Sequence, residues 1–330
     1  MIALHITSFF LALGVCLAMN QPNSGSSPST AVPLALLVMG GLIYGSFFSA
    51  TRVAVDANVP PTALAFWQAL LGALILLCLS LVMRDLPKVS WAHIRLYGAI
   101  GVFAFSIPLI ALTFAAPNLP AGLLGLVLTL VPSLTYLGAM FARLEKFNWL
   151  STLGLASGLI GVVIIVLSSS SVSGEFSGLW FMVALIAPLG YAMSNVTVAL
   201  IRPAEATTIQ LSTGVFVVAA PVLLIPMLLI DGVYFFSGAN FTGFGAVLWS
   251  GITNVVIFIT LFEVIYRRGP VFFSQFNYIA PAAGLFWAYL IFNDVFAPIV
   301  WLAIAFMALG LFLANKGTAE SMKSQTTSAK

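Results

Sequence analysis

Charge is what this sequence has least of. The 330 residues include 12 basic and 9 acidic side chains, or 6% of the chain, whereas 61% of the residues are apolar. A soluble domain carries roughly a quarter charged residues. An exterior this apolar is stable in lipid but associates in water. The composition therefore excludes an ordinary soluble domain and predicts an integral membrane protein.

Other scarce residues exclude further classes. Cys16 and Cys78 both lie in apolar runs and form neither a disulfide framework nor a metal site. With only His5 and His93, no histidine-rich metal site or catalytic dyad is visible. A phosphate-binding Gly-Lys-Ser loop is missing, which excludes ATP-driven transport by this chain alone. The small basic excess does not suggest nucleic acid, and we expect neither an enzyme nor a cofactor.

Long apolar runs dominate what is present. A transmembrane helix needs about 20 mainly apolar residues. Ten runs qualify: 33–51, 63–83, 96–116, 121–142, 150–168, 178–200, 208–230, 244–265, 271–292 and 297–315. Only the eighth contains a charge, Glu263. A helix satisfies its own backbone hydrogen bonds in lipid, so we predict an all-α fold with ten transmembrane helices.

The segments that connect these spans alternate between many and few basic residues. If the first span starts in the cytoplasm, the cytoplasmic segments hold Arg84, Lys88, Arg95, Arg143, Lys146, Arg202, Arg267, Arg268, Lys316, Lys323 and Lys330. The other side holds Arg52 alone. Positive residues concentrate on the cytoplasmic side of membranes. We therefore expect a multi-pass inner-membrane protein with both termini of the ten-helix core in the cytoplasm.

The two ends of the chain are read separately. Residues 1–19 are apolar and 20–30 are polar, so 1–32 forms a hydrophobic extension with a linker. A cleaved signal would leave the new N-terminus outside, against the charge distribution. Two explanations of residues 1–19 fit the charge distribution: an extra transmembrane helix, or a translation start placed too far upstream. Residues 316–330 are polar and are expected to form a disordered cytoplasmic tail.

An internal repeat is the next feature. Residues 33–168 and 178–315 form two five-span halves separated by the linker 169–177. The matched pairs are Tyr44 with Tyr191, Pro61 with Pro203, Gln68 with Gln210, Pro132 with Pro281, Glu145 with Asp294, and Gly161 with Gly310. Because five is odd, the second half crosses the membrane in the opposite sense. Inverted repeats are typical of alternating-access transporters.

Three stretches carry a family resemblance. They are Tyr44–Arg52 (YGSFFSATR), Leu130–Gly161, and Arg268–Asp294 with the helix that follows. The chain resembles the EamA family of the drug/metabolite transporter superfamily over roughly residues 33–315. It departs from the family pattern with Arg52 in place of Lys, Gln68 in place of Arg, and Asp294 in place of Glu. The resemblance implies a transporter and leaves the substrate open.

Polar side chains inside spans usually face the bundle interior, because facing lipid is costly. Ser274, Asn277 and Tyr278 share one helical face, and Tyr191, Ser194 and Asn195 repeat the pattern. The substrate-binding candidates are Trp67, Gln68, Tyr191, Asn195, Gln210, Asn254, Ser274, Asn277 and Tyr278. The competing interpretation is interhelical hydrogen bonding, worth about 0.6 kcal/mol each on average.

A second group is assigned to gating or hinge motion: Arg52, Pro132, Pro281, Glu145 and Asp294. The prolines would equally give static kinks, and Glu145 would equally cap the fifth span. Glu263 is the candidate for proton coupling, but Arg267 at i+4 favours an ion pair.

Glycines at 154, 158 and 161 form a small-residue face, which suits packing within the bundle or a homodimer contact. The leading hypothesis is a secondary transporter of a small organic metabolite, amino-acid-like or drug-like, working as an exporter. Facilitated exchange or uptake is the alternative within transport, and a non-transporting membrane scaffold or assembly subunit is the alternative outside it. The expected partners are that substrate and the bilayer.

Overall fold

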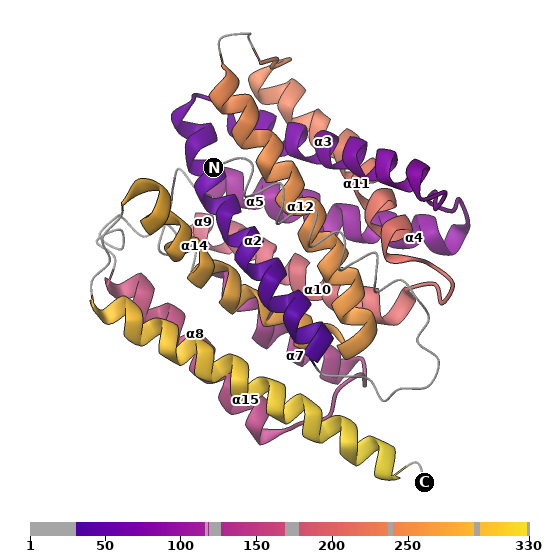
Figure 1. Cartoon of the computed structure of the whole chain (residues 1–330), viewed down its shortest axis with the longest axis vertical. Coiled ribbons are helices and arrows are strands. Elements are labelled where there is room, and N and C mark those ends of the chain that lie inside the picture. Colours follow the sequence, from indigo (N-terminus) through magenta and orange to yellow (C-terminus); the bar gives the residue numbers. More distant parts are fainter. Residues whose placement is uncertain are drawn as a thin grey trace.

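A computed structural model describes residues 31–115, 118, 127–168, 178–236, 240–293 and 298–328. Every regular element within these residues is a helix (Figure 1). The N-terminal extension up to residue 30, the linker 169–177 and Asp294 lie outside the described residues. The all-α class expected from the sequence is confirmed.

Each of the ten expected spans contains at least one described helix. The first half contains α2 (Ala31–Asp56), α3 (Pro61–Val82), α4 (Trp91–Ile100), the π-helix η1 (Gly101–Ser106), α5 (Ile107–Ala115), α7 (Val131–Phe141) and α8 (Trp149–Ser168). The second contains α9 (Gly178–Ala184), α10 (Ile186–Ile201), α11 (Thr208–Pro226), the π-helix η4 (Met227–Asp231), α12 (Phe241–Arg268), α13 (Pro270–Ser274), α14 (Phe276–Phe292) and α15 (Pro298–Ser328). Six stretches in the described part are long and apolar enough to cross a membrane by length and composition.

Helices from the two halves interleave. Helix α2 packs against α12 and α14, and α10 packs against α7 and α5. Helix α3 lies beside α11, and α8 lies along α15 at one edge of the bundle (Figure 1). Each half therefore buries its helices largely against the other half.

Glycine makes the α8–α15 contact very close. A Cβ added at Gly310 would lie 2.6 Å from the backbone nitrogen of Gly158, and one at Gly154 would lie 2.5 Å from that of Ala314. Real side chains do not tolerate such distances, so these positions require glycine. The small-residue face of the fifth span is thus used within the chain, where it lets two backbones touch.

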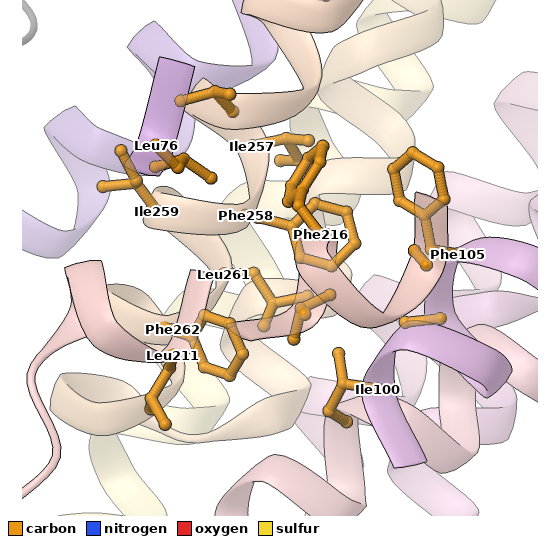
Figure 2. Close-up of a cluster of buried hydrophobic side chains, with 14 of the residues drawn as sticks. Leu76, Ile100, Phe105, Leu211, Phe216, Ile257, Phe258, Ile259, Leu261 and Phe262 are labelled. Atoms are coloured by element: carbon orange, nitrogen blue, oxygen red, sulfur yellow. The ribbon is translucent and has the colours of Figure 1, made fainter. Parts of the chain in front are cut away.

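The main hydrophobic core lies between α3, α11, α12 and the first turns of the third span (Figure 2). Phe105, Phe216 and Phe258 meet at its centre, with ring centroids 5.2 to 5.5 Å apart. Such tilted and edge-on pairs add about 0.5–1.5 kcal/mol each beyond their buried area. The cluster ties η1 to α11 and α12.

Polar contacts close one end of the bundle. Asp85, after α3, accepts hydrogen bonds from Thr207 Oγ1 at 2.5 Å and Gln210 Nε2 at 2.7 Å. Arg202, after α10, donates to the carbonyl of Phe262 at 2.6 Å. The segments that follow α3 and α10 therefore lie at the same end as the C-terminal part of α12.

A matching contact closes the other end. Thr62, in the first turn of α3, donates to the carboxylate of Asp231, the last residue of η4. Asn240 Nδ2 donates to the carbonyl of Ala57 at 3.0 Å. The antiparallel pair α3–α11 is thus joined at both ends by a threonine–aspartate contact.

Two features differ from the expectations. Helix α15 continues to Ser328, where the sequence predicts a disordered tail from residue 316. Extending an existing helix needs no new nucleus, so a polar sequence without proline continues it readily. Pro132 lies in the first turn of α7 and not in the interior of a helix, so its missing N–H breaks no helical hydrogen bond. Pro281 does lie inside a helix.

Candidate functional site

A cavity of about 200 Å³ lies between the two halves. Its walls come from α2, α3, the η1–α5 region and residue 128 on one side, and from α10, α12, α13 and α14 on the other. The lining residues are Tyr44, Phe47, Phe48, Gln68, Ala104, Phe105, Leu109, Leu112, Leu128, Tyr191, Asn195, Asn254, Ile257, Phe258, Leu261, Phe273, Phe276, Asn277, Ala280 and Pro281. None of the described side chains of α8, α11 and α15 lines it.

The lining is aromatic and uncharged. Its described residues include six phenylalanines and two tyrosines, and none of them is Asp, Glu, Lys or Arg. Tyr44 stacks on Phe47 at 4.9 Å and meets Phe276 at 5.4 Å, which joins α2 to α14 across the wall. Among the described lining residues, the polar side chains are four amides and two phenols.

Two of the amides form a pair whose orientation is fixed. Asn254 Nδ2 donates to the carbonyl of Ser250 and to Gln68 Oε1, both at 2.9 Å. A backbone carbonyl only accepts, so the nitrogen of Asn254 has to face it. The same nitrogen then orients the oxygen of Gln68. Gln68 Nε2 and Asn254 Oδ1 remain as one donor and one acceptor in the lining.

Asn277 is oriented in the same way. Its Nδ2 donates to the carbonyl of Ser274 at 3.0 Å, which leaves Oδ1 as the remaining acceptor. Pro281 has no N–H, so the backbone carbonyl of Asn277 loses its helical donor four residues on. Asn195 Nδ2 donates to Thr135 Oγ1 at 3.2 Å. The amides thus use their N–H groups on the protein and leave mainly oxygens.

Comparison with known proteins bears on this architecture. Residues 31–167 match the EamA-like transporter family. This segment is an EamA domain. It spans α2 to α8, and the family places the chain among membrane transporters of the drug/metabolite transporter superfamily and not among enzymes.

The fold has a solved counterpart as well. A structure described as "Crystal structure of protein" matches with a TM-score of 0.68 at 18% identity, covering 87% of this chain and 98% of that chain. At this identity the match shows the fold alone. No curated protein matches the sequence. Residues 31–167 are therefore an EamA-like transporter domain within a multi-pass membrane protein.

Five of the nine binding candidates lie in the cavity. Gln68 comes from the EamA domain, and Tyr191, Asn195, Asn254 and Asn277 come from the second half. They lie on four different helices, so the structure brings together side chains that are up to 209 positions apart in the sequence (68 to 277).

The other four candidates serve as structural contacts. Trp67 Nε1 donates to the carbonyl of Tyr234 at 2.9 Å, and Tyr278 Oη donates to that of Leu155 at 3.1 Å. Ser274 Oγ donates to the carbonyl of Val271. Gln210 lies at N3 of α11, in a capping box with Thr207.

The position of Gln210 corrects the proposed pairing with Gln68. Helix α3 starts at Pro61 and α11 at Thr208, so Gln68 is the eighth residue of its helix and Gln210 the third. Residues that match in sequence therefore occupy different turns, and only Gln68 reaches the cavity.

The gating candidates are dispersed. Pro281 lines the cavity, whereas Arg52 lies over the ring of Phe292, 4.1 Å from its centroid. Glu145 lies in the loop between α7 and α8, near Gly269, where a Cβ would be 3.9 Å from Glu145 Oε1. Burial raises the pKa of Glu145 to about 7.

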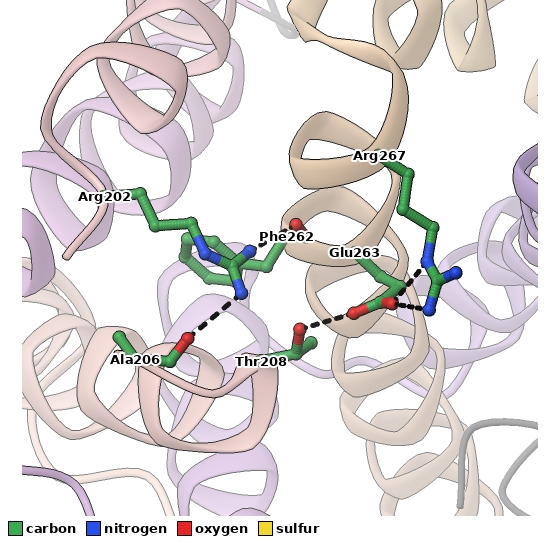
Figure 3. A network of polar contacts seen from close by, with 6 residues as sticks. All are labelled: Arg202, Ala206, Thr208, Phe262, Glu263 and Arg267. Carbon is green, nitrogen blue, oxygen red and sulfur yellow. Dashed lines mark hydrogen bonds and ion pairs between the residues drawn. The ribbon is translucent and has the colours of Figure 1, made fainter. Parts of the chain in front are cut away.

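Glu263 belongs to a polar network outside the cavity (Figure 3). Its carboxylate accepts from Arg267 Nε at 2.6 Å and from Thr208 Oγ1 at 2.7 Å. Arg202 donates to the carbonyls of Phe262 and Ala206 beside it. Both oxygens of Glu263 thus accept from donors within the protein, and one of them forms the ion pair with Arg267 that the spacing predicts.

Several lining residues were not candidates in the sequence. Tyr44 appears there only as a repeat match and in the family-like stretch. In the sequence, nothing distinguishes Phe47, Phe105 and Phe258 from phenylalanines that face lipid. The π-helix η1 contributes Ala104 and Phe105 to the wall. Single π-turns are frequent at functional sites, but no residue pattern in the sequence predicts this π-helix.

Proposed function

We propose that this chain is a secondary transporter in the cell inner membrane that exports a small organic metabolite by alternating access between its two halves. The observation that carries the proposal is the cavity of amide and aromatic side chains, which both halves line. A cavity at the interface between halves is where such transporters bind their substrates. A scaffold has no need of one.

The packing supports an inverted repeat. Span 1 (α2) packs on spans 8 and 9, and span 6 (α10) packs on spans 3 and 4. Spans 2 and 7 pair with each other, as do spans 5 and 10. Exchanging the halves leaves this scheme unchanged, as a two-fold axis requires. The fourth and ninth spans also both end in a left-handed residue, Arg143 and Asn293.

Matched residues of the two halves also meet at the cavity. Tyr44 and Tyr191, paired in the sequence repeat, both line it. The two threonine–aspartate contacts of α3 and α11 also exchange under this two-fold relation. One joins the start of α3 to the segment after α11, and the other joins the start of α11 to the segment after α3. These contacts support two related halves that enclose the site.

The orientation follows from the distribution of charge. The end closed by Asp85 and Arg202 gathers the segments that contain Arg84, Lys88 and Arg267. We propose that this end faces the cytoplasm. In intact cells, Lys88→Cys should resist a membrane-impermeant thiol reagent added from outside, and labelling would refute the orientation.

Transport itself is tested with one matched pair of variants. Cells or inside-out vesicles are loaded with labelled candidate metabolites, and flux is normalised to folded protein. Gln68→Ala removes the cavity donor and should reduce flux severalfold. Gln210→Ala makes the same change outside the cavity and should retain flux per folded molecule. Equal flux in both variants, or no flux for any compound, would contradict the proposal.

A further inference from the structure

The orientation of the cavity amides determines which polar groups remain for a ligand. Asn254 and Asn277 each use Nδ2 on a backbone carbonyl, at 2.9 and 3.0 Å. Because carbonyls cannot donate, neither amide can be flipped without losing this bond. Within the described part of the chain, their Oδ1 atoms have no other donor, so both oxygens remain available to a ligand.

The donors in the lining are fewer. Gln68 Nε2 is the amide donor left over, because Gln68 Oε1 is held by Asn254. The backbone carbonyl of Asn277, which faces the missing N–H of Pro281, adds another acceptor. The phenols of Tyr44 and Tyr191 accept or donate equally. The fixed polar surface is therefore rich in acceptors.

The aromatic surface of the cavity also favours a ligand that donates hydrogen bonds. Ring faces carry negative charge density and attract cations, whereas they disfavour anions. The described lining contains no basic residue to balance a carboxylate. A carboxylate entering the cavity would meet amide oxygens and ring faces and would lose most of its hydration without compensation.

We propose that the cavity selects substrates whose polar end is an N–H₂ or N–H₃⁺ group on an apolar body, and discriminates against carboxylates. The group donates to Asn254 Oδ1 and Asn277 Oδ1. A primary carboxamide also accepts from Gln68 Nε2. The apolar body lies against the phenylalanine rings. This inference rests on the proposed function for the identity of the site, and it adds the substrate class.

Three probes of similar size test it: 2-phenylethylamine, phenylacetamide and 3-phenylpropionate. Their binding to the purified protein in nanodiscs is measured by isothermal titration at pH 7. The amine and the carboxamide should each bind at least about tenfold more tightly than the carboxylate, a ratio that corresponds to about 1.4 kcal/mol. Equal or tighter binding of 3-phenylpropionate would overturn the proposal, as would failure of all three probes to bind.

Substitutions test whether Asn254 and Asn277 bind the amine. Asn277→Leu and Asn254→Leu should each weaken the amine at least fivefold, whereas Asn118→Leu makes the same change at an exposed position and should not. Asn277→Asp is nearly isosteric; it loses the hydrogen bond to the Ser274 carbonyl but adds a negative charge, which should strengthen the amine and weaken the carboxylate further. It keeps the test valid if a leucine variant fails to fold, and unchanged affinities in Asn277→Asp would overturn the proposal.

The two proposals fail separately. If the amine binds as expected but no probe crosses proteoliposome membranes, the selectivity stands and the transport function is contradicted. If flux occurs with 3-phenylpropionate preferred over the amine, the transport function stands and the selectivity is wrong.

Discussion

Glu145 offers a sharp test of the fold, because its charge is costly where it lies. Burial raises the pKa of this loop carboxyl from an ordinary 4.5 to about 7. A shift of that size corresponds to up to about 3 kcal/mol between its two protonation states. Below the unfolded pKa, the carboxyl is protonated in both states and costs nothing. As the pH rises towards 7, the unfolded chain ionises first, so stability is lost through this interval.

The perturbation is Glu145→Gln, which keeps the shape and removes the charge. The free energy of unfolding is measured in mixed detergent at pH 4.5, 6, 7 and 8. The difference between variant and wild type should grow in favour of the variant by up to about 3 kcal/mol between the lowest and highest pH. Partial exposure of the side chain makes this an upper value. Glu205→Gln, at an exposed site on the same end of the protein, is the control. Parallel stability curves for the wild type and Glu145→Gln would refute the reasoning.

Three further predictions concern packing, end contacts and coupling. Gly310→Leu should destabilise the protein by about 1–3 kcal/mol in thermal unfolding, because its Cβ would meet the Gly158 backbone, whereas Gly98→Ala, with open space around it, should be neutral. Asp85→Ala should cost about 1.5–3 kcal/mol of unfolding free energy by losing two charge-assisted hydrogen bonds, and Asp231→Ala less, since Asp231 is exposed; equal costs would contradict this. Glu263→Gln should retain most flux in proteoliposomes with and without a pH gradient, and a gradient stimulation abolished by this change would identify Glu263 as the coupling site.

Sequence reasoning located several cavity-lining residues from local polarity alone. Gln68, Asn254 and Asn277 stand out in apolar helices, and each lies in the cavity. It failed for Gln210, because aligning residue types across the halves ignored where each helix starts. Ser274 and Tyr278 were equally conspicuous in the sequence, yet each is used to hold a helix. Polarity alone does not show which side of a helix faces a cavity and which faces a neighbouring carbonyl.

The sequence by itself determined the membrane class, the all-α fold and the uneven distribution of basic residues. These are properties of short windows, because the cost of placing a residue in lipid is nearly independent of its distant neighbours. Only the tertiary structure decided that α8 packs on α15 through glycine, that η1 turns Phe105 into the wall, and that Asn254 orients Gln68 across 186 positions. Helix partners and rotations depend on side-chain packing and on hydrogen bonds between distant segments, and neither is encoded in any single stretch of the chain.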